Sequence, residues 1–127
     1  MAVRVLLVED NPHNIRLIEQ LLGDISEEIG KEIDLIKADS GKLALQVAED
    51  KEVALVLMDI SLPDMDGISI TKELKKLESF AHIPFIVVTA HVLPNDAETF
   101  KIIFEDSIAK PIDEEVFFTK VKKWLGE

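Results

Sequence analysis

Three short apolar runs constrain the fold of this chain more than any other feature of its sequence. They are residues 3–8 (VRVLLV), 53–58 (VALVLM) and 85–88 (FIVV), and none shows a regular alternation of apolar and polar residues. Strands that are buried on both faces of a parallel sheet have this composition. Two weaker candidates, residues 33–38 (IDLIKA) and 107–109 (SIA), bring the expected number of strands to five.

Segments with the apolar spacing of helices follow these runs. Pro12 suits the first turn of one helix, and Ser40 and Asp113 are positioned to cap two others. Two further helices are expected at residues 68–77 and 94–104. The helix that begins after Asp113 is expected to bury Val116, Phe117, Val121, Trp124 and Leu125.

Strands and helices therefore alternate five times along the chain. Crossover helices between strands of one parallel sheet cover both of its faces. The sequence thus predicts an α/β fold, a doubly wound (βα)5 sandwich with three layers in the order α/β/α. A length of 127 residues predicts that residues 1–127 form one domain.

The charge and composition exclude several classes of partner and site. The chain has 25 acidic against 14 basic residues, and a net charge of −11. Such a surface repels nucleic-acid phosphates and anionic lipid headgroups, which argues against both as partners. Without cysteine, neither a disulfide nor a thiolate metal site can form. With no apolar stretch of membrane-spanning length and no signal peptide, we expect a soluble, cytoplasmic protein.

Polar residues follow four of the five expected strands where each strand ends. Glu9 and Asp10 follow the first strand, Asp59 the third, Thr89 the fourth and Lys110 the fifth. Because the carboxyl ends of parallel strands meet at one edge of a sheet, these side chains are expected to lie close together. Each residue alone is an ordinary turn residue, but their coincidence at one edge predicts a site.

The chemistry of this set is specific. Three clustered carboxylates cannot all stay ionised without a compensating cation, and Mg2+ prefers oxygen ligands of this kind. The charges of Glu9, Asp10 and Asp59 are balanced by Mg2+ and Lys110 together. Such a site suits a phosphoryl group that approaches Asp59 as nucleophile while Lys110 and the Thr89 hydroxyl hold its oxygens.

At this point the sequence closely resembles the receiver domains of two-component response regulators. The resemblance rests on residues 5–11 (VLLVEDN), 57–67 (LMDISLPDMDG), 86–90 (IVVTA) and 108–112 (IAKPI), which occur in the family's order and approximate spacing. It implies a flavodoxin-like sheet with strand order 2-1-3-4-5. It also implies a cis peptide bond before Pro111.

Matched position by position, the resemblance assigns roles to the site residues. Asp59 would be the phosphoacceptor, and Thr89 and Lys110 would hold the phosphoryl oxygens. Asp10, Asp59 and the backbone carbonyl of Ser61 would bind Mg2+ directly, with Glu9 acting through water. The donor would be a histidine kinase or a histidine phosphotransfer protein. The domain would act as a signalling switch on a downstream protein, and would catalyse only its own phosphorylation and dephosphorylation.

Two other functions remain open from the residues themselves. A magnesium-dependent phosphoryl- or nucleotidyl-transfer enzyme is one, because Asp64 and Asp66 form an Asp-x-Asp pair. A flavin-binding module of the same fold is the other, although its phosphate-binding loop should be rich in Ser, Thr and Gly, whereas here Glu9 and Asp10 open that loop.

The sequence departs from the family at three places, one of which is residues 102–106 (IIFED), where receivers often carry a Gly-Ala pair. Ser107 stands where receivers usually carry a Tyr or Phe that turns inward on activation, so we expect the usual coupling to output to be weak. Residues 24–32 also make the stretch between the first helix and the second strand longer than expected. The downstream target and the oligomeric state are not readable from the sequence.

Overall fold

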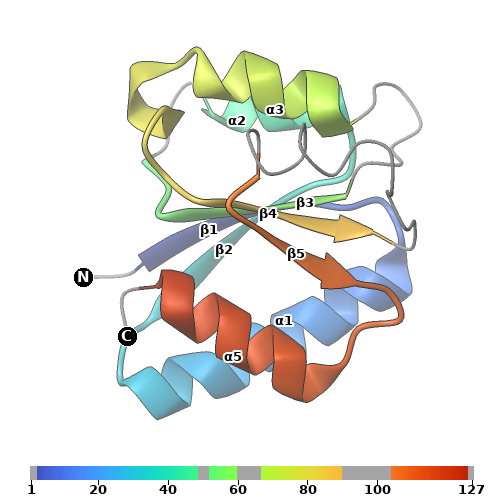
Figure 1. The fold of residues 1–127 in the computed structure, drawn as a ribbon, viewed down its shortest axis with the longest axis vertical. Helices are drawn as coiled ribbons and strands as arrows, with labels where there is room; N and C mark the ends of the chain where they lie inside the picture. The colour runs from blue at the N-terminus through green and yellow to red at the C-terminus, as the bar shows by residue number, and fades with distance from the viewer. Residues whose placement is uncertain (1–2, 49–51, 60–66, 90–103, 126–127) are drawn as a thin grey trace.

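The computed structural model describes residues 3–48, 52–59, 67–89 and 104–125 (Figure 1). Five parallel strands form one sheet in the order β2-β1-β3-β4-β5, which confirms the predicted topology. The strands are β1 (Val3–Val8), β2 (Ile33–Ala38), β3 (Leu55–Asp59), β4 (Phe85–Thr89) and β5 (Asp106–Ala109). Every residue of β3 and β4 is buried, which explains why both strands are apolar up to their last residue, Asp59 in β3 and Thr89 in β4.

Helices cover both faces of the sheet and give the predicted three layers. They are α1 (Pro12–Ile29), α2 (Gly41–Ala48), α3 (Gly67–Lys75), the 3-10 helix η1 (Glu78–Phe80) and α5 (Glu114–Trp124). In Figure 1, α2 and α3 lie on one side of the sheet, and α1 and α5 lie on the other. The helix expected at residues 94–104 falls almost wholly outside the described residues.

Side-chain caps fix where three of these helices begin. Ser40 Oγ accepts the backbone N–H of Leu43 at 3.1 Å, and Asp113 Oδ1 accepts that of Val116 at 3.1 Å, as predicted. Asn11, which the sequence analysis did not assign, caps α1 by accepting the N–H groups of His13 and Asn14. Each cap satisfies backbone donors that the helix itself leaves without an acceptor.

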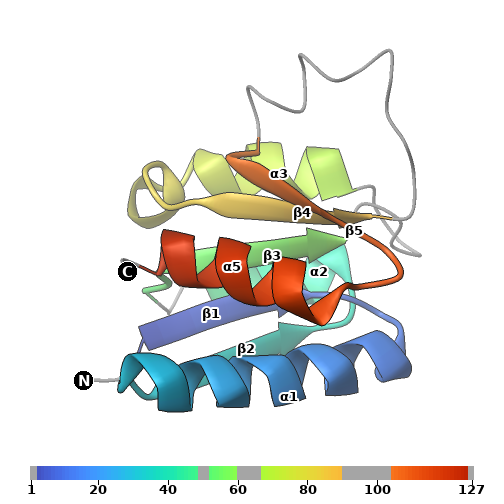
Figure 2. The same cartoon turned by 60° about the horizontal axis from the view of Figure 1, so that its bottom comes forward.

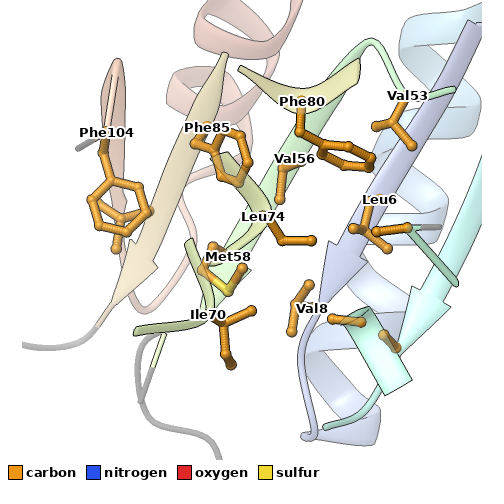
Figure 3. Packing of buried hydrophobic residues seen from close by; sticks show 14 residues of the cluster. Leu6, Val8, Val53, Val56, Met58, Ile70, Leu74, Phe80, Phe85 and Phe104 are labelled. Atoms are coloured by element: carbon orange, nitrogen blue, oxygen red, sulfur yellow. The ribbon is translucent and has the colours of Figure 1, made fainter. Parts of the chain in front are cut away.

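The sheet separates two apolar cores. The core under α2 and α3 packs the rings of Phe80, Phe85 and Phe104 with aliphatic residues of β1, β3 and α3 (Figure 3). The core under α1 and α5 is built around residues such as Ile18, Leu57 and Phe117. Because both faces of the central strands are covered, ligand access is left to the edges of the sheet.

One expectation for α5 is wrong. Phe117, Val121 and Leu125 are buried, as predicted, because a spacing of four residues keeps them on the side of α5 that packs on the sheet. Val116 is 40% exposed, since it precedes Phe117 by one residue and is rotated away from that side. Trp124 is half-buried, and its indole N–H donates to Asp106 Oδ2 at 2.9 Å.

The unexpectedly long stretch after the first helix is additional helix. α1 continues to Ile29 and ends at Gly30, whose φ of 69° lies in the left-handed region. The N–H of Gly30 donates to the carbonyl of Ser26 at 3.0 Å and closes the last turn. Among the described residues, none of the helices combines the length and the hydropathy that crossing a bilayer requires.

Replacing either glycine of this region with alanine should change the stability of the fold, in opposite directions at the two positions. Gly23 lies inside α1 with open space where a Cβ would be, so Gly23→Ala should raise the free energy of unfolding by about 0.5–1 kcal/mol. Gly30→Ala should lower it by about 1–2 kcal/mol, because a Cβ is strained at this positive φ. Urea unfolding of both variants measures the two changes, and a change of the same sign in both would contradict this account of the end of α1.

Candidate functional site

The parallel ladder places five of the six predicted site residues at the carboxyl edge of the sheet. Asp59 and Thr89 are the last residues of β3 and β4, and Lys110 directly follows β5. The backbone continues the ladder here, because the N–H of Lys110 donates to the carbonyl of Thr89 at 2.9 Å. The N–H of Glu9 likewise donates to the carbonyl of Ala38, at 3.0 Å. Hydrogen bonds of the sheet therefore fix the positions from which these side chains extend.

Three carboxylates converge at this edge. Glu9, Asp10 and Asp59 each offer an oxygen, and these oxygens all lie within 4.8 Å of one another. Glu9 and Asp59 are 1% and 5% exposed, whereas Asp10 is exposed to solvent. The cluster thus has two buried acids and one acid on the surface of the protein.

Lys110 is the cation that contacts both buried acids, Glu9 and Asp59. Its Nζ lies 3.0 Å from Glu9 Oε1 and 3.4 Å from Asp59 Oδ2, and the lysine side chain is itself largely buried. One ammonium therefore contacts two acids, Glu9 directly after β1 and Asp59 at the end of β3. The peptide bond between Lys110 and Pro111 is cis, as the resemblance implied.

Glu9 is electrostatically the most constrained member of the cluster. Burial raises the pKa of Glu9 above its ordinary value, and the negative charge of Asp59 adds to the rise. The ion pair with Lys110 and the backbone N–H of Asn11, which donates to Oε2 at 3.2 Å, oppose this increase in pKa. The contact of Glu9 Oε1 with the described residues is this ion pair, with Lys110 Nζ 3.0 Å away.

These features fit a divalent metal ion. With its three carboxylates ionised, the cluster carries three negative charges, and the ion pairs found among the described residues bring one positive charge to it, that of Lys110. Glu9 Oε1 is buried and has Lys110 Nζ at 3.0 Å as its charge partner, but this one lysine is shared with Asp59. A hard cation that takes oxygen ligands, such as Mg2+, would supply further positive charge to these carboxylates.

The remaining predicted positions divide into two groups. Thr89 ends β4 at the same edge, and the residue is 7% exposed. Ser61, Asp64 and Asp66 lie outside the described residues. The backbone N–H of Asn11 was missed as a contact of Glu9, although an Asn before Pro12 is a recognisable sign of a helix start.

Comparison with known proteins identifies the family. Residues 5–122 match the response regulator receiver domain. The chain belongs to this family. The receiver is 38% identical over 128 residues to the polar-differentiation response regulator DivK of Brucella ovis, with 100% of this chain and 99% of DivK covered.

The receiver also resembles parts of larger signalling proteins. It is 34% identical over 129 residues to the sensor histidine kinase GacS of Pseudomonas protegens, but it spans only 13% of the length of that kinase. Receivers thus occur both as nearly the whole of a response regulator and as a small part of a kinase. Either relationship makes this chain a signalling domain of a two-component system.

Solved structures of other proteins share the fold of this chain. The receiver domain of the sensor histidine kinase PA1611 from Pseudomonas aeruginosa superimposes with a TM-score of 0.84 at 30% identity, with both chains fully covered. That structure holds a magnesium ion coordinated in its active-site cleft. The chemotaxis protein CheY4 of Vibrio cholerae, at 20% identity and a TM-score of 0.83, supports the fold alone.

The raised pKa of Glu9 predicts how stability depends on pH. Because the folded-state pKa lies above the unfolded value of about 4.5, ionisation of Glu9 destabilises the fold as pH rises through the folded pKa. In magnesium-free buffer, Glu9→Gln should therefore be more stable than the unsubstituted receiver at pH 7. This advantage should vanish as the pH falls to about 4.5.

Urea unfolding over a pH series with a chelator present measures this difference. Glu27→Gln, at an exposed position of α1, is the matched control and should leave stability unchanged. Added Mg2+ should stabilise the unsubstituted receiver more than Glu9→Gln, because the variant loses a carboxylate of the cluster. A Glu9→Gln variant that is less stable at pH 7 without magnesium would contradict this electrostatic account.

Proposed function

We propose that Asp59 accepts a phosphoryl group, and that Glu9, Asp10 and Asp59 hold the Mg2+ ion this transfer requires. The position of Asp59 is the observation that supports the proposal. It is the acid that ends the central strand β3, it belongs to the carboxylate cluster, and it lies 3.4 Å from Lys110 Nζ. By the resemblance, the carbonyl of Ser61 supplies a further metal ligand, and Glu9 acts through water.

The proposed reaction is a transfer between a nitrogen and an oxygen. A carboxylate oxygen of Asp59 forms a bond to phosphorus, while the bond between phosphorus and a donor histidine nitrogen breaks and its electron pair stays on that nitrogen. The product is an acyl phosphate, which water later hydrolyses back to the carboxylate. When bound, Mg2+ supplies positive charge that offsets the charge of the phosphoryl oxygens.

Lys110 and Thr89 are proposed to hold the transferred group. Lys110 already contacts Glu9 and Asp59, so its ammonium is in reach of an oxygen carried on Asp59. Thr89 lies next to Lys110 across the β4–β5 pair, since the Thr89 carbonyl accepts the Lys110 N–H. The ammonium and the hydroxyl would donate hydrogen bonds to the phosphoryl oxygens, and so link modification to the ends of β4 and β5.

The biological setting follows from the same proposal. A histidine kinase or a histidine phosphotransfer protein would be the donor, and a downstream protein would recognise the modified domain. We place this exchange in the cytoplasm, with residues 1–127 as one receiver domain whose catalysis is confined to its own phosphorylation and dephosphorylation. Membership of the receiver family and the acids that open the loop after β1 disfavour the nucleotidyl-transfer and flavin-binding alternatives.

Substitution of Asp59 tests the acceptor directly. Incubation with acetyl phosphate and Mg2+ should add one phosphoryl group to the receiver, and Asp59→Asn should abolish this addition, as intact-mass measurement would show. Asp39→Asn is the matched control, because Asp39 follows β2 at the same edge of the sheet but is exposed and lies outside the carboxylate cluster. Equal rates of modification in Asp59→Asn and in the unsubstituted protein would refute the assignment.

Substitution of Lys110 tests the electrostatic part of the proposal. Lys110→Met keeps much of the side-chain volume but removes the ammonium, so phosphorylation should slow by about 100-fold or more. Lys76→Met, at an exposed position on α3's side of the sheet, should leave the rate unchanged. Single-turnover phosphorylation measures both rates, and an unchanged rate in Lys110→Met would remove Lys110 from the proposed machinery.

A further inference from the structure

The turn between β1 and α1 joins the carboxylate cluster to the start of a helix. Figure 2 shows this turn at the end of the sheet toward which the strand arrows point, where the turn after β5 also lies. Glu9 and Asp10 directly follow β1, and Asn11 is the last residue before α1 begins at Pro12. Two acids of the cluster are therefore connected to α1 through the single residue Asn11.

Contacts with α1 hold Asn11 in one backbone conformation. Its Oδ1 accepts the N–H groups of His13 at 2.9 Å and Asn14 at 3.2 Å. Its carbonyl accepts the N–H of Ile15 at 3.0 Å. The φ of −84° and ψ of 118° are extended, which is also the conformation that a following proline such as Pro12 favours. Because φ relates the N–H of a residue to the chain that follows it, the cap fixes where the N–H of Asn11 points relative to α1.

The N–H of Asn11 is directed at the carboxylate of Glu9. It donates to Glu9 Oε2 at 3.2 Å, while the other oxygen, Oε1, lies 3.0 Å from Lys110 Nζ. The two oxygens of one carboxylate thus contact the start of α1 and the residue after β5. Lys110 also pairs with Asp59 at 3.4 Å, so its charge is divided between two acids, whereas the N–H of Asn11 serves Glu9.

From this geometry we propose that Asn11 is a positioning residue, which caps α1 and thereby holds the Glu9 carboxylate where it meets Mg2+ or its water. The inference rests on the proposed function, because it takes the cluster to be the Mg2+ site. Groups that hydrogen-bond to the acids of a metal site orient those acids and affect metal affinity. When Lys110 turns its ammonium to the phosphoryl oxygens, the N–H of Asn11 keeps Glu9 in place.

A cap that only stabilised the fold would leave metal affinity unchanged, and a second helix supplies the comparison. In α2, Ser40 Oγ accepts the N–H of Leu43 at 3.1 Å, and the carbonyl of Ser40 accepts the N–H of Ala44 at 3.0 Å. Ser40 lies just after β2 at the same edge of the sheet, but its cap is not joined to an acid of the cluster. Ser40→Ala is therefore the matched control for Asn11→Ala.

The Mg2+ dissociation constant, measured by amide chemical-shift titration of the full chain, tests the role of the cap. Asn11→Ala keeps the N–H but frees its direction, so the dissociation constant should rise by about threefold to tenfold. Asn11→Ser should restore the affinity, because serine caps helices as well as asparagine does. Since serine has no carboxamide, this rescue would assign the effect to the cap. Ser40→Ala should lower stability toward urea as Asn11→Ala does, with the Mg2+ affinity unchanged.

A double-mutant cycle tests whether Asn11 acts through Glu9. In a Glu9→Ala background there is no carboxylate to position, so Asn11→Ala should change the dissociation constant by less than about twofold. With a chelator present, the amide of residue 11 should be less protected from hydrogen exchange in Asn11→Ala than in Asn11→Ser, since the turn is looser without its cap.

Three results would overturn the inference and leave the proposed function intact. They are an unchanged Mg2+ affinity in Asn11→Ala, an equal loss of affinity with and without Glu9, and equal exchange protection of residue 11 in the alanine and serine variants. An unsubstituted receiver that binds no Mg2+ would instead overturn the metal site of the proposed function, and this inference with it.

Discussion

Three carboxylates held together against one ammonium form the constraint on which the functional edge of this receiver depends. Glu9 and Asp59 are buried, and Lys110 contacts both of them. Bringing like charges together in a partly dehydrated place destabilises the fold, and the raised pKa of Glu9 reflects this effect. The sheet tolerates the arrangement because its two cores, one on each face, supply stability elsewhere. A site with excess negative charge is therefore ready to accept a cation.

Much of the fold was predictable because burial and helix capping leave local traces in the sequence. The apolar composition of β3 and β4 before their last residues follows from burial on both faces, and the caps at Ser40 and Asp113 are local hydrogen bonds. The end of α1 was not predicted, because propensity alone does not show that the helix continues to Gly30. The exposure of Val116 was also not predicted, because the orientation of α5 about its own axis on the sheet determines which of its apolar residues are buried.

The candidate site was predictable in membership but not in detail. Strand ends that meet at one edge were enough to gather Glu9, Asp59 and Lys110. The simultaneous contact of Lys110 with two acids depends on side-chain geometry that spacing does not encode. Ser107 shows the same limit: its carbonyl accepts the Nζ of Lys120 at 2.5 Å, so β5 is tied to α5 by a contact that no motif indicated.

The most direct test of the account is to identify the atom that receives phosphorus. Borohydride reduces an aspartyl phosphate to homoserine, so mass spectrometry of peptides from the treated protein locates the modified carboxylate. After incubation with acetyl phosphate, the account predicts homoserine at position 59 alone, and none when a chelator removes Mg2+. Homoserine at position 10, or modification of Asp59 that proceeds equally without magnesium, would contradict it.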